Sequence, residues 1–196
     1  MRVLDVGCGT GESAAYANHD VVGIDIDPQR LAIAQQKHPN AFFYAMAAED
    51  MRQLHDEEFD CVISNVAMPY MNIPAALAEM YRVLKPGGEL RMTLHPPGFT
   101  VRELRRTFPQ PKPTLFRLFV LGNGIWFHFT GRVLHLGRRF ESCQTRAGIT
   151  KALKRAGFAK AEFPAANQFV VRARKPGSER VYADSLRVSD NGYYVK

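Results

Sequence analysis

The chain has 196 residues, of which 46% are hydrophobic and 23% are charged, and its formal net charge is +7 at pH 7. This balance is typical of one globular domain with a sizeable core, and it excludes a disordered or low-complexity chain. The charge is −6 over residues 1–100 and +13 over residues 101–196. Such asymmetry is compatible with an RNA or anionic-surface partner, and equally with a solvated basic face.

The start of the chain and its cysteines indicate the cellular compartment in which the protein is expected. Met1 and Arg2 lead directly into an apolar strand, without the apolar segment of a signal peptide. The cysteines are odd in number and show no paired spacing, and they are Cys8, Cys61 and Cys143. We therefore expect reduced thiols and a cytoplasmic protein.

The first predicted element is a short buried strand, Val3–Val6, that ends in the turn Gly7–Gly11, with a helix expected from about Ser13. Glycine accepts positive φ and lets the backbone touch a ligand, which would also face the first N–H groups of the helix. The third glycine comes one residue too early for the dinucleotide fingerprint, and no Lys-Ser/Thr pair of a P-loop follows.

The sequence D-V-G-C-G-T-G over residues 5–11 resembles motif I of the class I S-adenosylmethionine-dependent methyltransferases. The resemblance implies an α/β, Rossmann-like, doubly wound fold. Its mostly parallel sheet would have seven strands and end in an antiparallel hairpin. It also implies S-adenosylmethionine as cofactor, and motif I supplies the expected contacts Asp5, Gly7, Cys8, Gly9 and Gly11.

A second buried strand, Val21–Asp25, ends on an acid at the edge where α/β sheets bind ligands. The resemblance makes Asp25 the acid that accepts the ribose hydroxyls, with Ile26 beside it. The alternative is a helix cap, but Asp27 is the better cap for the helix Pro28–Lys37 because proline follows it.

The third predicted strand, Ala41–Ala45, is followed by a segment that resembles the adenine-binding part of the family. Relatives often carry Asp where Ala47 stands here. The contact would then fall to the backbone around Ala48, to Glu49 or to Asp50. A solvated helix start is the alternative interpretation of these acids.

The fourth predicted strand, Phe59–Asn65, resembles motif IV, which would place Asn65 near the transferable methyl group. The following residues differ from the [DNS]-P-P-[YFW] pattern, which argues against methyltransferases that act on DNA bases or glutamine. Tyr70 or Met68 could flank the sulfonium, since an aromatic face favours a cation. Both could instead belong to the core.

The helix Pro74–Leu84 runs into L-K-P-G-G, another landmark of this family, and then into the strand Glu89–Leu94. His95 ends that strand at its carboxyl edge, where a neutral imidazole could take a proton from the methyl acceptor. His95 and Tyr70 are therefore the candidate catalytic residues. A structural role is the alternative for His95.

Residues 96–144 lie outside the resemblance and are rich in aromatic residues and arginine. We interpret them as a helical lid inserted into the domain, and we expect its aromatic side chains to face an acceptor pocket. The aromatic candidates are Phe116, Phe119, Trp126 and Phe129. A dimer interface, a membrane-surface patch and an outward RNA-binding surface remain alternatives.

The helix Thr145–Ala156, capped by Gly157, returns to the family pattern, and strands Phe158–Phe163 and Gln168–Ala173 are predicted to close the sheet. The methyltransferase domain is thus expected over residues 1–175, with a polar tail over residues 176–196.

The resemblance implies methyl transfer from S-adenosylmethionine to a hydrophobic small molecule, within the ubiquinone/menaquinone-methylase-like (methyltransferase type 11) group. We expect no metal site, and no transmembrane segment because the apolar stretch 115–129 is interrupted by Arg, Asn and Gly. An RNA methyltransferase that uses the basic half and a non-catalytic binding protein with this fold are the alternatives. Relatives carry helices before motif I that cover the cofactor. We therefore expect either a truncated start or an open cofactor site; the oligomeric state stays open.

Overall fold

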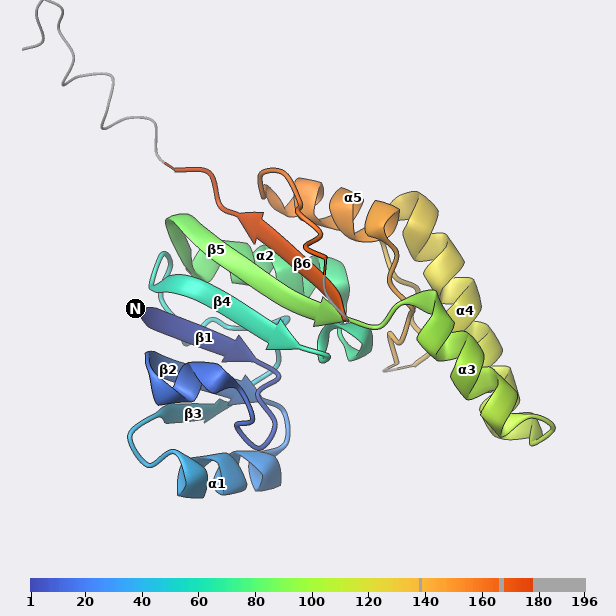
Figure 1. Cartoon of the computed structure of the whole chain (residues 1–196), viewed down its shortest axis with the longest axis horizontal. Helices are drawn as coiled ribbons and strands as arrows, with labels where there is room; N and C mark the ends of the chain where they lie inside the picture. Colours follow the sequence, from blue (N-terminus) through green and yellow to red (C-terminus); the bar gives the residue numbers. More distant parts are fainter. Residues whose placement is uncertain (138, 166–167, 178–196) are drawn as a thin grey trace, which may run out of the picture.

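The computed structural model describes residues 1–137, 139–165 and 168–177. The strands form one sheet, and helices connect most of them along the chain (Figure 1). The strands are β1 (Arg2–Val6), β2 (Asp20–Asp25), β3 (Phe42–Ala45), β4 (Phe59–Asn65), β5 (Leu84–Leu94) and β6 (Phe169–Arg174). The helices are η1 (Ala14–Ala17), α1 (Pro28–Lys37), η2 (Met68–Tyr70), α2 (Ile73–Val83), α3 (Pro97–Thr107), α4 (Pro111–Thr130) and α5 (Arg146–Ala156), where η denotes a 3₁₀ helix.

The strand order in the sheet is β3-β2-β1-β4-β5-β6, and every neighbouring pair is parallel except β5 and β6. From β1 the chain first moves outward through β2 and β3, and it then returns to place β4 on the other side of β1. This reversal is a topological switch point, and in such sheets the crevice at the carboxyl ends of the strands binds ligands. The predicted α/β, mostly parallel, Rossmann-like fold is confirmed.

Apolar side chains form a core on each face of the sheet. One face carries the larger core, in which Leu4, Val62 and Leu90 of the strands pack with Leu77 of α2 and Ile149 of α5. The opposite face carries a smaller cluster in the described part of the chain, formed by Val3, Val21 and Cys61 with Tyr16 of η1. Because successive strand residues point to opposite faces, neighbours such as Val3 and Leu4 separate into the two layers.

Three expected elements differ from the structure. The strand expected over Glu89–Leu94 begins five residues earlier, at Leu84. The helix expected from Ser13 is a single 3₁₀ turn, η1, and the Ser13 side chain accepts a hydrogen bond from the Ala15 N–H. The expected strand Phe158–Phe163 forms one bridge to β6, between Glu162 and Arg172, so the described residues build six strands rather than seven. Pro164 follows directly and has no N–H to extend that ladder. Most of the expected polar tail, residues 178–196, lies outside the described residues.

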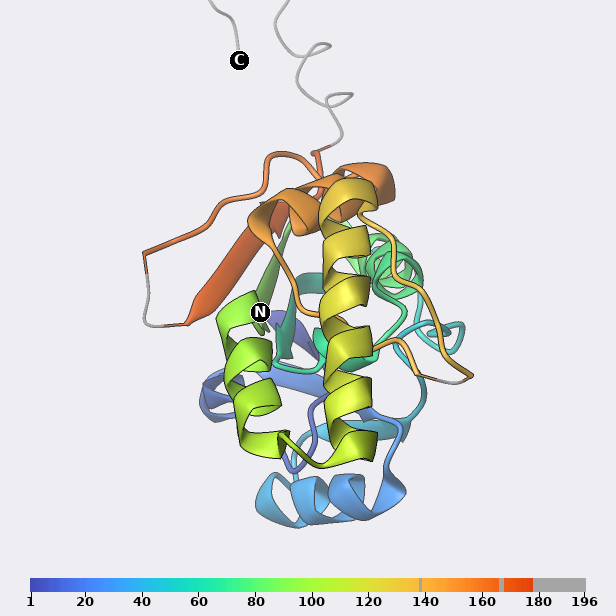
Figure 2. The same cartoon turned by 90° about the vertical axis from the view of Figure 1, so that its right-hand side faces the viewer.

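The chain between β5 and α5 forms a helical hairpin of α3 and α4, which extends outward from the carboxyl end of the sheet (Figures 1 and 2). Glycines let α4 pack closely on its neighbours. A Cβ on Gly124 would lie 2.1 Å from the Cys143 sulfur, and one on Gly148 of α5 would lie 2.5 Å from the Phe127 ring. Among the described helices, none combines the length and apolarity needed to cross a bilayer.

Candidate active site

The glycines of the turn after β1 serve different purposes. The N–H groups of Gly7 and Cys8 both donate to the Ile24 carbonyl, at 2.8 and 3.0 Å, which anchors the turn on β2. Gly7 has φ +71°, and a Cβ there would lie 2.3 Å from the Ala67 Cβ. Gly11 has φ +75°, and a Cβ there would meet the His38 ring at 2.9 Å. Both positions therefore require glycine for packing as well as for their positive φ.

Gly9 differs from these two because it faces open space. Its φ is +55°, and the one atom found within 4 Å of a Cβ built there is the tip of the Arg30 side chain, at 4.0 Å. The Gly9 N–H donates to Asp25 Oδ2 at 2.9 Å, and the Asp27 N–H donates to Asp25 Oδ1 at 3.0 Å. The turn and the end of β2 are thus held together by Asp25, whose oxygens retain lone pairs for ligand hydroxyls. Asp27 caps α1, as predicted.

Asp5 on β1 is a buried acid with 2% exposure. Burial raises its pKa to about 7, the nearby Tyr16 hydroxyl opposes this shift, and the charge of Asp25 adds to it. The Tyr16 oxygen is itself buried and outside normal hydrogen-bond geometry with every described residue. Asp5 makes no ion pair with any described residue. A cationic ligand group beside it would stabilise its charged form.

A cavity of about 650 Å³ lies at the carboxyl ends of β1, β4 and β5. The expected cofactor residues that line it are Asp5, Gly7, Cys8, Gly9 and Asn65. The expected residues outside its lining are Gly11, Asp25, Ile26, Ala48 and Glu49. Two of these are engaged elsewhere: Gly11 accepts a hydrogen bond from the His38 ring at 2.8 Å, and Glu49 Oε1 accepts one from the Asn72 N–H at 2.7 Å.

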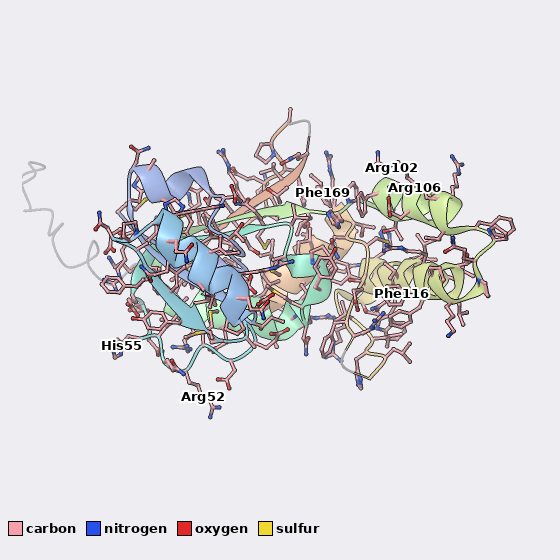
Figure 3. All side chains as sticks on the ribbon, turned by 90° about the horizontal axis from the view of Figure 1, so that it is seen from below. Arg52, His55, Arg102, Arg106, Phe116 and Phe169 are labelled. Atoms are coloured by element: carbon pink, nitrogen blue, oxygen red, sulfur yellow. The ribbon has the colours of Figure 1, made fainter. Side chains whose placement is uncertain are left out.

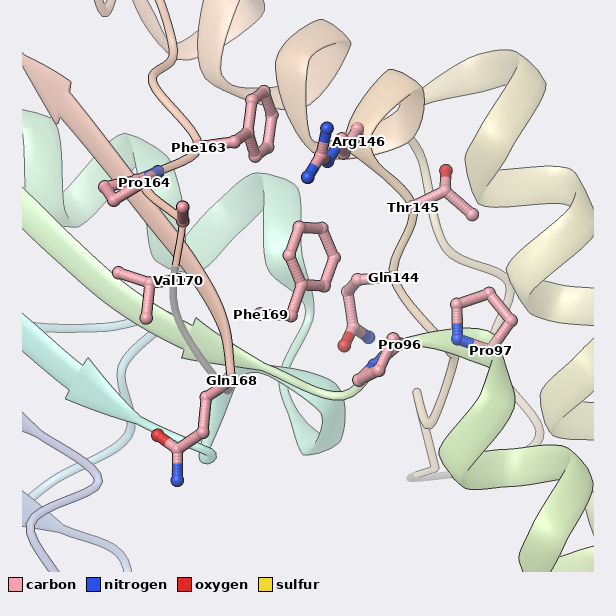
Figure 4. A pocket seen from close by; sticks show the side chains of 11 residues that line it. Pro96, Pro97, Gln144, Thr145, Arg146, Phe163, Pro164, Gln168, Phe169 and Val170 are labelled. Atoms are coloured by element: carbon pink, nitrogen blue, oxygen red, sulfur yellow. The ribbon is translucent and has the colours of Figure 1, made fainter.

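A second cavity, of about 420 Å³, lies between the end of β5, the start of α5 and β6 (Figure 4). Its walls are largely apolar and include Pro96, Pro97, Phe163, Phe169 and Val170. Four polar residues join them, and they are Gln144, Thr145, Arg146 and Gln168. The Arg146 guanidinium lies 5.4 Å from the centre of the Phe163 ring. Gln168 lines both cavities, which therefore adjoin.

Comparison with known proteins identifies the family of this chain. A family model described as a methyltransferase domain matches residues 4–92. A demethylmenaquinone methyltransferase from Chlorobaculum parvum is 32% identical over 171 residues, which are 83% of this chain and 67% of that protein. The chain belongs to the S-adenosylmethionine-dependent methyltransferases. Its methyl donor is therefore S-adenosylmethionine, as motif I indicated.

Solved methyltransferase structures share the fold. One from Methanosarcina mazei has a TM-score of 0.60 at 19% identity, covering 90% of this chain and 93% of its own. A Burkholderia thailandensis 1,6-didemethyltoxoflavin-N1-methyltransferase, solved with its acceptor and S-adenosylhomocysteine, has a TM-score of 0.58 at 19% identity and covers 89% and 71%. The first cavity suits the donor because it combines an open backbone turn at Gly9 with the buried acid Asp5.

The methyltransferase also has cavity residues that sequence reasoning missed. Arg30 in the first turn of α1 and Gln168 before β6 both line the first cavity. Val66 lines it too, with φ +60°, and its N–H donates to the Thr93 carbonyl at 2.9 Å. A β-branched residue at positive φ is an outlier of the kind found at functional sites. The sequence gives no signal for this strain, whereas the place of Arg30 opposite the glycine turn follows from the predicted helix.

The candidate catalytic residues lie close together but line neither cavity. The His95 ring stacks on Phe99 at 4.2 Å between centroids, and the Tyr70 ring approaches it edge-on at 6.4 Å. Burial lowers the pKa of His95, and the charge of Arg117 adds to this effect. His95 is therefore neutral at pH 7, the state a proton acceptor requires.

The insertion does not turn the aromatic residues named in the prediction toward either of the two cavities. None of Phe116, Phe119, Trp126 and Phe129 lines the second cavity. The buried positions of α4 are Val120, Asn123, Gly124 and Phe127, so the helical period turns Trp126 and Phe129 outward. No cluster of three or more His, Cys, Asp or Glu side chains able to hold a metal ion occurs among the described residues.

Proposed function

We propose that this methyltransferase transfers the methyl group of S-adenosylmethionine to a hydrophobic small molecule that binds in the second cavity. The observation that carries the proposal is the junction of a polar cavity at motif I with a largely apolar one at Gln168. A donor in the first cavity and an acceptor in the second would meet beside Gln168, the side chain that lines both. Holding the reacting atoms in line at about 3–3.5 Å supplies much of the rate enhancement in such a transfer.

Specific residues would hold the donor. S-adenosylmethionine supplies an activated methyl group, which leaves the sulfonium as the bond to the acceptor forms. Asp5 would bind the amino group, and Arg30 would bind the carboxylate. Asp25 would accept the ribose hydroxyls through the lone pairs that the N–H groups of Gly9 and Asp27 leave free. Ile26 is 76% exposed beside Asp25 and offers an apolar surface for the adenine ring.

The acceptor would be apolar, aromatic and oxygen-bearing. Phe163 and Phe169 provide flat apolar surfaces, and Figure 4 shows them facing the same space as Arg146. A guanidinium there would bind an acceptor oxygen with partial or full negative charge. A relative named demethylmenaquinone methyltransferase supports an acceptor of this class. His95 directly precedes the cavity residues Pro96 and Pro97, and its ring would have to turn from Phe99 toward the cavity to take a proton from the acceptor. Because these prolines also lead into α3, the α3–α4 hairpin would act as the lid of the cavity.

Calorimetry with S-adenosylhomocysteine, S-adenosylmethionine and NAD tests the donor site. We expect binding of the first two ligands and no comparable binding of NAD. Asp25→Ala should weaken binding at least about tenfold, since hydrogen bonds to a charged group contribute about 1.5–3 kcal/mol. Asp20→Ala, an exposed acid at the opposite end of the same strand, is the matched control. Unchanged affinity in Asp25→Ala would contradict the assignment.

Turnover with demethylmenaquinone, read as the mass gain of one methylene unit, tests the acceptor site. We expect Arg146→Ala to raise KM for this acceptor without changing the affinity for S-adenosylhomocysteine. The acceptor should bind about equally well at low and high salt. RNA held through six or more phosphates would instead lose roughly a thousandfold in affinity between about 50 and 200 mM salt. Methylation of RNA with that salt dependence would refute a small-molecule acceptor.

A further inference from the structure

The outer face of α4 is apolar along most of its length. Its exposed side chains between residues 115 and 129 are Leu115, Leu118, Ile125, Trp126 and Phe129. These positions recur every three to four residues, so they form one stripe on the helix. Exposure ranges from 45% for Trp126 to 71% for Leu115, and the one other exposed position within the stripe is Gly122. We call this stripe the apolar face.

The opposite side of α4 fixes the direction of the apolar face. Val120, Gly124 and Phe127 are buried against the body of the protein. The Asn123 side chain donates to the carbonyls of Leu134, at 3.0 Å, and Glu141, at 3.0 Å, and it accepts from the Leu134 N–H at 2.7 Å. These contacts prevent α4 from rotating to hide the stripe. In the part of the chain that the structure describes, the stripe therefore faces solvent.

Cations border the apolar face on both sides. Figure 2 looks onto the hairpin from outside and shows α3 on one side of α4 and the segment after α4 on the other. On α3, Arg102, Arg105 and Arg106 are exposed, and Figure 3 shows Arg102 and Arg106 pointing away from α4. On the other side, Arg132 and Arg139 are exposed, with Arg139 4.7 Å from the Phe116 ring.

The sequence of this region carries a strong excess of positive charge. Residues 101–139 contain eight arginine and lysine residues and a single acid, Glu103. Glu103 is paired with Arg106 at 3.1 Å, and Arg117 lies 3.8 Å away. An apolar helix face with Trp, Phe and Leu, bordered by arginine, is the pattern of a helix that lies in the interface of an anionic bilayer. RNA would pair with the arginines but would leave the apolar stripe in water.

We propose that the α3–α4 hairpin docks on the surface of an anionic lipid bilayer, with the apolar face inserted at the boundary of headgroups and acyl chains. The arginines on both sides would contact the lipid phosphates. Each cation near such a surface strengthens binding, and the effect falls off with salt. Docking needs neither cofactor nor methyl acceptor, so it stands independently of the proposed function.

The single tryptophan of the chain, Trp126, lies in the apolar face and reports directly on docking. The full chain is mixed with phosphatidylcholine vesicles that contain about 30% phosphatidylglycerol, and with pure phosphatidylcholine vesicles. We expect sedimentation with the anionic vesicles, a blue shift of Trp126 emission and quenching by brominated acyl chains. High salt should weaken binding to the anionic vesicles, because it screens the contacts between the arginines and the lipid phosphates. An apolar contact alone would show no such loss.

Matched variants separate the two parts of the surface. Ile125→Ser with Phe129→Ser should lower the partition coefficient at least about tenfold, because two apolar side chains no longer leave water. The control is Ile33→Ser with Phe42→Ser, which are similarly exposed on α1 and β3. Arg105→Glu with Arg106→Glu should abolish the preference for anionic vesicles. Its control is Arg52→Glu, at the opposite end of the molecule (Figure 3).

Several results would overturn the proposal. Suppose that the protein binds the vesicles but brominated acyl chains do not quench its Trp126 emission. This result would overturn the proposal even if every variant failed to fold. Emission that is already blue-shifted in the lipid-free monomer would show that the chain itself covers the apolar face. A lipid-free dimer that Ile125→Ser with Phe129→Ser dissociates would assign the face to a second copy of the chain.

Discussion

Replacing Asp5 by asparagine should stabilise the protein without ligand in a manner that depends on pH. Burial raises the pKa of Asp5 from 3.8 to about 7, so the folded state holds its proton more tightly than the unfolded state does. As pH rises from about 4 to 7, the unfolded chain releases this proton first, and the free energy of unfolding falls. A shift of about three pKa units corresponds to roughly 4 kcal/mol above pH 7. The asparagine side chain does not ionise, so the variant does not lose this free energy of unfolding as the pH rises.

Urea unfolding of the wild-type and Asp5→Asn proteins between pH 5 and 8 tests this reasoning. The stability gained by the variant should grow by roughly 2–3 kcal/mol over this range. The same variant should bind S-adenosylhomocysteine more weakly, because the acid opposite the ligand amino group is lost. Asp56→Asn, an acid in the exposed turn before β4, controls for general effects of charge. A stability difference that stays constant with pH would refute a raised pKa, and a destabilised variant would refute the unfavourable burial of the charge.

Three further predictions concern Arg30, Val66 and His95. Arg30→Ala should weaken S-adenosylhomocysteine binding about tenfold in calorimetry with no loss of stability, because the charge-assisted contact of Arg30 with the ligand is lost. Arg52→Ala is the control. Equal affinity of the wild-type and Arg30→Ala proteins would contradict a role of Arg30 in binding. Val66→Gly should raise the free energy of unfolding by roughly 1 kcal/mol, since glycine tolerates φ +60°; a loss of that size would disprove strain. Because the pKa of His95 is lowered, the acidic limb of kcat should lie below pH 6.5, and His95→Gln should remove it; an unchanged profile would exclude His95 as the base.

Much of the fold could be predicted because buried strands and helix caps are local signals. The bounds of α1 and β4 match the prediction, and Asp27 caps α1 as its position before proline indicated. The prediction of a seventh strand was wrong because a strand forms only where a partner strand can pair with it along its length. The apolar residues of 158–163 are typical of a strand, but a single bridge to Arg172 forms before Pro164.

The candidate site was predictable where the glycine turn dictates geometry and not where side chains compete for partners. The positive φ at Gly9 follows from motif I, and the place of Asp25 at the end of β2 follows from the predicted strand. Glu49 was expected to reach adenine, yet its carboxylate holds the Asn72 N–H, a contact between residues 23 positions apart. The aromatic residues of α4 were assigned by composition alone, and their direction depends on which face carries Gly124.

The close packing of Gly124 on Cys143 makes the cysteine a reporter of hairpin opening. The sulfur occupies the space that a side chain at Gly124 would need, and Cys143 is 3% exposed. An alkylating reagent therefore has no room to add to this thiol while α4 is in place. The labelling rate of Cys143, followed by mass spectrometry of the peptide that contains it, would measure how often α4 separates from the domain, and a bound membrane or acceptor that holds the hairpin would slow that rate.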